Sequence, residues 1–255
     1  LPVDFARAAR GMGVTVIAVG VVPGVDPELP TAADTYHDIS VGQLASIIAT
    51  LKNEQVTQIT FLGKVTKELM FTGQVALDNR MRQLLGGLPD HSDDTVMLAF
   101  VRELAAEGIG VLDQTRFIRS LMPGPGLLSA RAPSADEEAD MAFGLEMARA
   151  VGGLDIGQTV VVKDRAVLAV EAIEGTDACI RRGGALGRGG ATVAKAAKPN
   201  QDLRFDVPGV GPDTIRAMIE SGATALVIEA GKTLFASRAA SVELADRHGI
   251  AIKAM

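Results

Sequence analysis

The chain contains 255 residues, 47% of them hydrophobic, and carries a formal net charge of −6. One large or two smaller domains are expected at this length, and the acidic balance argues against general nucleic-acid binding. One cysteine, Cys179, excludes an intramolecular disulfide, and three dispersed histidines do not favour a His-rich zinc centre. No apolar run approaches the roughly 20 residues needed to span a bilayer, and no signal peptide is visible. The sequence therefore predicts a cytoplasmic protein, with peripheral contact at a membrane surface left open.

Helix-like and strand-like segments alternate through the first half of the chain. The patterns predict helices over 3–11, 40–52, 74–86 and 93–107, and strands over 14–21, 58–62 and 111–112. Such alternation predicts a doubly wound parallel sheet, that is, a Rossmann-like domain. Two Pro-Gly pairs at 122–126 disfavour regular structure, and Ser134 then begins a helix with a capping box. We place the boundary at about residue 130, with an N-terminal α/β domain over 1–130 and a C-terminal α/β catalytic domain over 131–255.

The second half of the chain predicts an α/β domain with a mixed sheet. Strands over 158–162 and 167–171 flank a hairpin-like turn at Lys163-Asp164-Arg165. The patterns that follow predict helices over 175–183, 211–222 and 237–248, and strands over 191–196, 225–229 and 250–252.

Segment 195–213 concentrates charged side chains among glycines and prolines. Lys195 and Lys198 can bind anionic oxygens. Asp202 and Asp206 can bind a hard divalent cation, and Arg204 can donate two parallel hydrogen bonds to a phosphate. On an extended chain, the even spacing of the two aspartates and the arginine points all three side chains to one face. Phosphoryl-transfer or phosphoanhydride chemistry needs this combination. The alternative is a solvated loop with an internal Asp–Arg salt bridge of little energetic value.

A second acidic motif follows the predicted strand 167–171. Glu171 and Glu174 come at the end of this strand, and Gly175-Thr176-Asp177 opens a helix. Backbone N–H groups at a helix N-terminus favour phosphate or another anion, and α/β proteins usually place ligands at strand C-termini. The alternative is that Thr176 or Asp177 simply caps the helix.

Three further features give weaker signals. Gly63-Lys64-Val65 ends a predicted strand and, with Arg80 and Arg82 further along, gives weak support for an anionic ligand. The stretch 183–190 is glycine-rich but matches neither a P-loop nor a dinucleotide fingerprint, so a flexible connection is the favoured interpretation. Cys179 lies in a predicted helix and is interpreted as a packed small residue. Three arginines in or next to the glycine-rich stretch could bind an anion: Arg181, Arg182 and Arg188.

Several motifs together resemble one protein family. They are Val111–Phe117, Leu154–Lys163, Val170–Asp177, Ile180–Arg182, Lys198-Pro199, Gln201–Pro208 and Glu229–Gly231. They resemble the bacterial metal-dependent UDP-2,3-diacylglucosamine pyrophosphatase family of lipid A synthesis, the type unrelated to calcineurin-like enzymes. The resemblance covers nearly the whole chain. It implies Mg²⁺-dependent hydrolysis of UDP-2,3-diacylglucosamine to 2,3-diacylglucosamine 1-phosphate and UMP, with two α/β domains enclosing the substrate between them.

The resemblance also suggests roles for individual residues. It places the essential acid at Asp202 or Asp206, and these two carboxylates would hold Mg²⁺ or, alternatively, Mn²⁺. Positive side chains would offset charge on the pyrophosphate oxygens. The expected catalytic residues are Asp202, Asp206, Arg204 and Lys198. The expected substrate-binding residues are Glu171, Glu174, Gly175, Thr176, Asp177, Lys195, Gln201 and Lys64.

Other functions and partners stay open from the sequence. One alternative is a non-catalytic sugar-nucleotide binding or regulatory protein, and another is a different Mg²⁺-dependent nucleotide-sugar hydrolase. The expected partner is an acylated UDP-sugar, with contact at the inner face of the inner membrane and a homodimer both left open. The acyl chains need apolar surface, for which Leu127 and Leu128 are candidates, although burial within the fold is the favoured interpretation.

Overall fold

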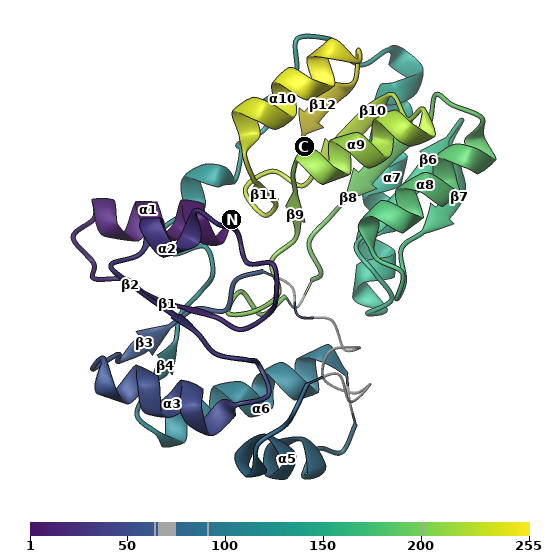
Figure 1. The fold of residues 1–255 in the computed structure, drawn as a ribbon. Coiled ribbons are helices and arrows are strands. Elements are labelled where there is room, and N and C mark those ends of the chain that lie inside the picture. Colours follow the sequence, from purple (N-terminus) through teal and green to yellow (C-terminus); the bar gives the residue numbers. More distant parts are fainter. Residues whose placement is uncertain (64, 66–74, 91, 200) are drawn as a thin grey trace. The chain divides into compact units, whose positions relative to one another are not determined.

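The computed structural model describes the chain except for residues 64, 66–74, 91 and 200 (Figure 1). The chain divides into two compact units. Unit 1 comprises Leu1–Ile118 with Leu203–Phe205, and unit 2 comprises Arg119–Asp202 with Asp206–Met255. The division after Ile118 precedes the position near residue 130 at which we placed the boundary, because part of the intervening stretch pairs with the sheet of unit 2.

Unit 1 contains short parallel strand pairs and helices. β1 pairs with β2, and β3 pairs with β4, in both cases in parallel. The predicted helix over 74–86 begins at Asn79, where the Asp78 side chain accepts from the Met81 N–H at 2.7 Å. The elements of unit 1 are α1 (Pro2–Gly11), β1 (Ile17–Gly20), α2 (Leu29–Ala32), β2 (Thr35–Asp38), α3 (Leu44–Asn53), β3 (Gln58–Ile59), α5 (Asn79–Gly86), α6 (Asp93–Ala106) and β4 (Gly110–Val111).

Unit 2 is organised around a six-stranded mixed sheet with the order β5-β12-β10-β8-β6-β7. β8, β10 and β12 are parallel to one another, whereas β6 is antiparallel to both β8 and β7, and β5 is antiparallel to β12. Its elements are η1 (Arg119–Leu121), β5 (Gly126–Leu127), α7 (Ala135–Gly153), β6 (Thr159–Lys163), β7 (Ala166–Val170), α8 (Thr176–Gly187), β8 (Thr192–Lys195), β9 (Gly209–Val210), α9 (Pro212–Ser221), β10 (Ala225–Ile228), β11 (Leu234–Phe235), α10 (Arg238–Arg247) and β12 (Ala251–Ala254). The predicted α/β class with a mixed C-terminal sheet is confirmed.

Helices cover both faces of this sheet (Figure 1). α7 packs Met141 and Leu145 against Val160 and Val162, whereas α8, α9 and α10 pack on the other face, around Val161. Successive side chains of β6 therefore point to opposite faces of the sheet, as the two-residue period of a strand requires.

The glycine-rich stretch 183–190 is not the flexible connection that the sequence predicted, because α8 continues through Gly187. A Cβ atom at Gly183 would lie 2.5 Å from the Cβ of Val161, and one at Gly184 would lie 2.5 Å from the carbonyl oxygen of Ser221. Glycine at these positions lets α8 approach β6 and α9 more closely than any other residue would allow.

Candidate active site

The sheet of unit 2 gathers several predicted site residues at one edge. β7, β8, β10 and β12 run in the same direction, so their carboxyl ends meet there, together with the amino end of antiparallel β6. Glu171 follows β7, Lys195 ends β8, Glu229 follows β10 and Gln158 precedes β6. Open α/β sheets bind their ligands at this kind of edge.

A first chain of hydrogen bonds connects Lys195, Thr176 and Glu171. The Lys195 ammonium donates to the Thr176 hydroxyl at 2.9 Å, and the Thr176 hydroxyl donates to Glu171 Oε1 at 2.8 Å. Lys195 is only 8% exposed, so its charge requires polar partners. Thr176 begins α8, and Gly175 before it has a φ of 83°, in the left-handed region that favours glycine. A cation and a carboxylate are thereby placed beside the N-terminus of α8.

A second chain connects Gln158, Asp206 and Lys198. The Gln158 side-chain amide donates to Asp206 Oδ1 at 3.2 Å, and Lys198 Nζ lies 3.3 Å from Asp206 Oδ2. Lys198 Nζ also lies 2.7 Å from Asp155 Oδ1. The backbone N–H of Gln158 donates to Glu171 Oε2 at 3.3 Å, which joins the two chains. We call the joined residues the polar edge cluster: Gln158, Glu171, Thr176, Lys195, Lys198 and Asp206.

Gln201 lies beside the polar edge cluster. Its side-chain oxygen accepts from the Lys198 backbone N–H at 2.7 Å, and its side-chain amide lies 3.4 Å from Gln158 Oε1. The first bond lies within the loop after β8, and the second connects this loop to Gln158, the residue before β6.

Segment 202–206 forms a turn, so the chain is not extended here, which was the condition for the two aspartates and Arg204 to share one face. The Asp206 backbone N–H donates to the Asp202 carbonyl at 2.9 Å, and the Leu203 carbonyl accepts from the Gln114 N–H at 2.8 Å. Residues 203–205 belong to unit 1, whereas the two aspartates belong to unit 2. The strand-like alternation that would place Arg204 on one face with both aspartates is therefore absent.

Glu229 is a buried acid at the same edge that the sequence analysis did not assign to the site. It is 6% exposed, and its Oε1 lies 3.2 Å from Arg149 and 3.0 Å from Lys232. Its Oε2 accepts from the Ala197 N–H at 2.9 Å. The available signal was its position at the end of a predicted strand, which is the same signal that identified Glu171.

The surroundings of Lys198 and Glu229 stabilise the charged forms of both side chains. Burial acts to lower the pKa of Lys198, but the hydrogen bond with Asp155 and the charge of Asp206 outweigh it, so the pKa is raised. Burial acts to raise the pKa of Glu229, but Lys232, the Ala197 N–H and Arg149 lower it below its ordinary value. Lys198 is therefore a cation, and Glu229 an anion, at neutral pH.

Some predicted residues have partners outside the polar edge cluster. Glu174 accepts from the Ala172 N–H at 3.2 Å and pairs with Arg182, which lowers the pKa of Glu174. Asp177 lies in the first turn of α8. Lys64 lies outside the described residues.

Two arginines among the weaker sequence signals for an anion pair with acids of their own unit. Arg181 pairs with Glu220 at 2.7 Å, and Arg80 in unit 1 pairs with Glu103 and Glu107, both at 2.6 Å. Cys179 is fully buried, and burial raises the pKa of its thiol to about 12. A packed small residue, as predicted, matches this environment better than a nucleophile does.

Asp202 and Asp206 offer the carboxylate oxygens that Mg²⁺ prefers. Within the described part of the chain, no group of three or more His, Cys, Asp or Glu side chains is arranged to hold a metal ion. Mg²⁺ often takes one or two protein carboxylates and completes its shell with substrate phosphates and water. An ion shared with a substrate in this way needs no group of three protein acids.

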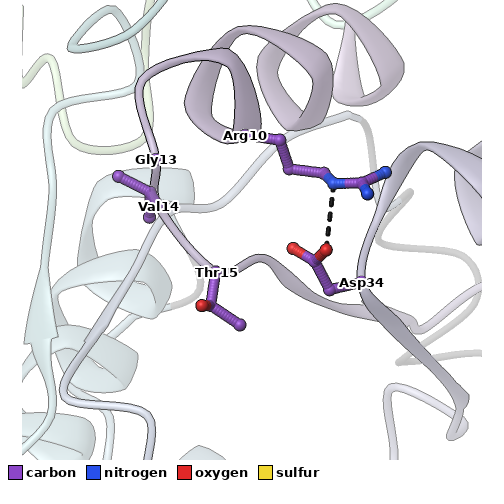
Figure 2. A pocket seen from close by; sticks show the side chains of 5 residues that line it. All are labelled: Arg10, Gly13, Val14, Thr15 and Asp34. Carbon is purple, nitrogen blue, oxygen red and sulfur yellow. Dashed lines mark ion pairs between the residues drawn. The ribbon is translucent and has the colours of Figure 1, made fainter.

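A separate hollow of about 270 Å³ opens on unit 1, lined by Arg10, Gly13, Val14, Thr15 and Asp34 (Figure 2). Arg10 Nε lies 3.0 Å from Asp34 Oδ1, and Arg10 also donates to the Ala32 carbonyl at 3.2 Å. The Arg10 charge is thus compensated by Asp34, and the lining includes none of the predicted site residues.

The fold and the polar edge cluster define a two-unit α/β protein with a buried lysine, carboxylates and a helix N-terminus at the carboxyl edge of a mixed sheet. Models of the LpxI N-terminal domain and the LpxI C-terminal domain match residues 1–121 and 124–253. The UDP-2,3-diacylglucosamine pyrophosphatase LpxI of Caulobacter vibrioides is 32% identical over 263 residues, covering 98% of this chain and 92% of that protein. The chain belongs to the LpxI family, which confirms the family that its motifs indicated.

Proposed function

We propose that the protein hydrolyses the pyrophosphate bond of UDP-2,3-diacylglucosamine, releasing UMP and 2,3-diacylglucosamine 1-phosphate. The observation that carries this proposal is the polar edge cluster, in which Lys195, Lys198, Glu171 and Asp206 meet at the carboxyl edge of the sheet. The relative from Caulobacter vibrioides, named for this activity, supports the choice of substrate.

The cations of the cluster would bind the pyrophosphate. Lys195 and Lys198 supply two positive charges, and the N–H groups at the start of α8 supply the positive end of a helix dipole. Because both lysines are already held by polar partners, they would stabilise the charge that develops as the P–O bond breaks without first having to reorganise. Glu174 and Asp177, beside this helix start, are proposed to bind uridine or sugar hydroxyls.

Asp202 and Asp206 would hold Mg²⁺, or Mn²⁺, together with a phosphate oxygen of the substrate. The ion would supply a Lewis acid that polarises the phosphate and acidifies a bound water. Asp206 is the acid that we propose as essential, because Gln158 and Lys198 fix both of its carboxylate oxygens. These two contacts would hold the Asp206 carboxylate in one orientation, as a metal ligand requires.

The test is to compare Asp206→Asn with a matched carboxylate in the same unit. Asp213 provides the control, because its side chain is 81% exposed and pairs with Arg216 one helical turn away. UMP release should fall at least about 100-fold in Asp206→Asn and stay within about twofold of wild type in Asp213→Asn. Full activity of Asp206→Asn would remove the proposed role of that residue.

Assays on the same purified wild-type protein distinguish the proposed hydrolase from the two alternative functions. A protein that binds UDP-2,3-diacylglucosamine but never cleaves it would be a sugar-nucleotide binding protein. Faster cleavage of a non-acylated UDP-sugar than of the diacylated one would instead indicate a different nucleotide-sugar hydrolase.

A further inference from the structure

Three exposed apolar side chains lie on two loops at the edge of unit 2 that carries the polar edge cluster. Leu154 is 72% exposed, Ile156 is 49% exposed and Ile173 is 99% exposed. We call these three residues the apolar rim. Leu154 and Ile156 lie between α7 and β6, and Ile173 lies between β7 and α8.

The two loops of the apolar rim are in direct contact. A Cβ atom at Gly157 would lie 2.1 Å from the carbonyl oxygen of Glu171, so the backbones at these positions touch. The Gln158 N–H bond to Glu171 Oε2 joins the loops at a second point. Single exposed apolar residues are common on protein surfaces, but these three lie on two loops that touch each other.

The acids next to the apolar rim are neutralised by cations of the same unit. Asp155, between Leu154 and Ile156, pairs with Lys198, and Glu174, next to Ile173, pairs with Arg182. This pairing lowers the cost of bringing the two loops into a medium of low dielectric constant. The Lys198 pair also attaches the Leu154–Ile156 loop to the polar edge cluster.

We infer that the apolar rim inserts into the surface of a lipid bilayer and so brings the polar edge cluster to a membrane-resident substrate. This inference rests on the proposed function, because a substrate with two acyl chains is anchored in a bilayer by its hydrocarbon. Among the described helices, none is long and apolar enough to cross a membrane. Shallow insertion of exposed side chains needs no such helix, and the full exposure of Ile173 suits a side chain that enters lipid.

The test compares two sets of substitutions in the full chain. The rim variant is Leu154→Ser, Ile156→Ser and Ile173→Ser combined. The control variant is Val167→Ser with Leu186→Ser, which removes apolar side chains that are 42% and 60% exposed. Val167 lies near the start of β7 and Leu186 near the end of α8, at the opposite end of these elements from the rim. Urea unfolding midpoints of both variants should match that of the wild type.

Co-sedimentation with vesicles of phosphatidylethanolamine and phosphatidylglycerol is measured first, because it does not depend on catalysis. The fraction of bound protein should correspond to a partition coefficient at least about tenfold lower for the rim variant, and unchanged for the control variant. Wild-type protein that does not sediment with vesicles, or a rim variant that sediments as well as wild type, would overturn the inference.

Turnover is then measured on two forms of substrate. The rim variant should hydrolyse a water-soluble analogue with short acyl chains within about twofold of wild type, but vesicle-embedded substrate about tenfold more slowly. Equal loss on both forms would overturn the membrane role and place the rim residues in the site itself. If wild type sediments with vesicles but cleaves neither substrate, the proposed function fails while the membrane contact stands.

Discussion

Gly157 offers a test of whether the contact between the two loops matters for catalysis. Its backbone φ is outside the left-handed range, so other residues can adopt its conformation and only space limits them. In Gly157→Ala the new Cβ would lie 2.1 Å from the Glu171 carbonyl oxygen and 3.1 Å from the Glu171 Cβ. Carbon–oxygen contacts are normally above about 3 Å, so the two backbones must separate by about 1 Å.

The expected effect on activity follows from what Glu171 holds. Its carboxylate accepts from the Thr176 hydroxyl and from the Gln158 N–H, so a shift of Glu171 disturbs both chains of the polar edge cluster. A displacement of about 1 Å in a site can cost about 100-fold in rate, and overpacking costs about 1–3 kcal/mol of stability. We expect kcat/KM of Gly157→Ala to fall by about 10- to 100-fold while the protein still folds.

The assay is the initial rate of UMP release, with urea unfolding measured on the same samples. Gly153→Ala is the matched control, because the nearest atom to its new Cβ would be Pro199 Cγ, at a normal van der Waals distance of 3.8 Å. A Gly157→Ala protein with kcat/KM within about twofold of wild type would refute the reasoning. So would an equal loss of activity in Gly153→Ala.

Three further predictions concern packing, metal and pH. Gly183→Ala should destabilise unit 2 by about 1–3 kcal/mol in urea unfolding, because its Cβ would lie 2.5 Å from the Val161 Cβ, whereas Gly153→Ala should not. Chelation by EDTA should abolish UMP release and added Mg²⁺ should restore it; undiminished turnover in EDTA would exclude the proposed ion. Burial acts to raise the pKa of Glu137, but Arg131, the Ser134 N–H and Thr224 outweigh it and lower the pKa from 4.5 to about 2. The stability that Glu137 contributes is thus present above pH 4.5 and lost as the pH falls towards 2. Glu137→Gln should therefore make the unfolding free energy depend less steeply on pH in this range. An unchanged slope would contradict the lowered pKa of Glu137.

Local sequence signals were sufficient for much of unit 2. The capping box at the start of α7 is present, with the Ser134 hydroxyl accepting from the Glu137 N–H at 3.2 Å and Glu137 Oε2 accepting from the Ser134 N–H at 2.8 Å. The hairpin of β6 and β7 and the start of α8 after Gly175 also follow the predicted pattern. These features depend on neighbouring residues, whose chemistry a single sequence displays.

Features that depend on distant partners were missed. The glycines of α8 resemble those of a loop, and only the proximity of Val161 and Ser221 explains them. The strand β5 forms because Leu127 pairs with Lys253 of β12, which is distant in the sequence. Gln158 could not be assigned to the site, since nothing nearby in the sequence indicates that its amide meets Asp206.

The most direct test of the central claim is product analysis in ¹⁸O-labelled water. UDP-2,3-diacylglucosamine would be incubated with the wild-type protein and Mg²⁺, and the products analysed by mass spectrometry. We predict UMP and 2,3-diacylglucosamine 1-phosphate in equal amounts, with one ¹⁸O atom in the phosphate of one product. Release of intact UDP, or substrate that binds and stays uncleaved, would contradict the assignment of the polar edge cluster to pyrophosphate hydrolysis.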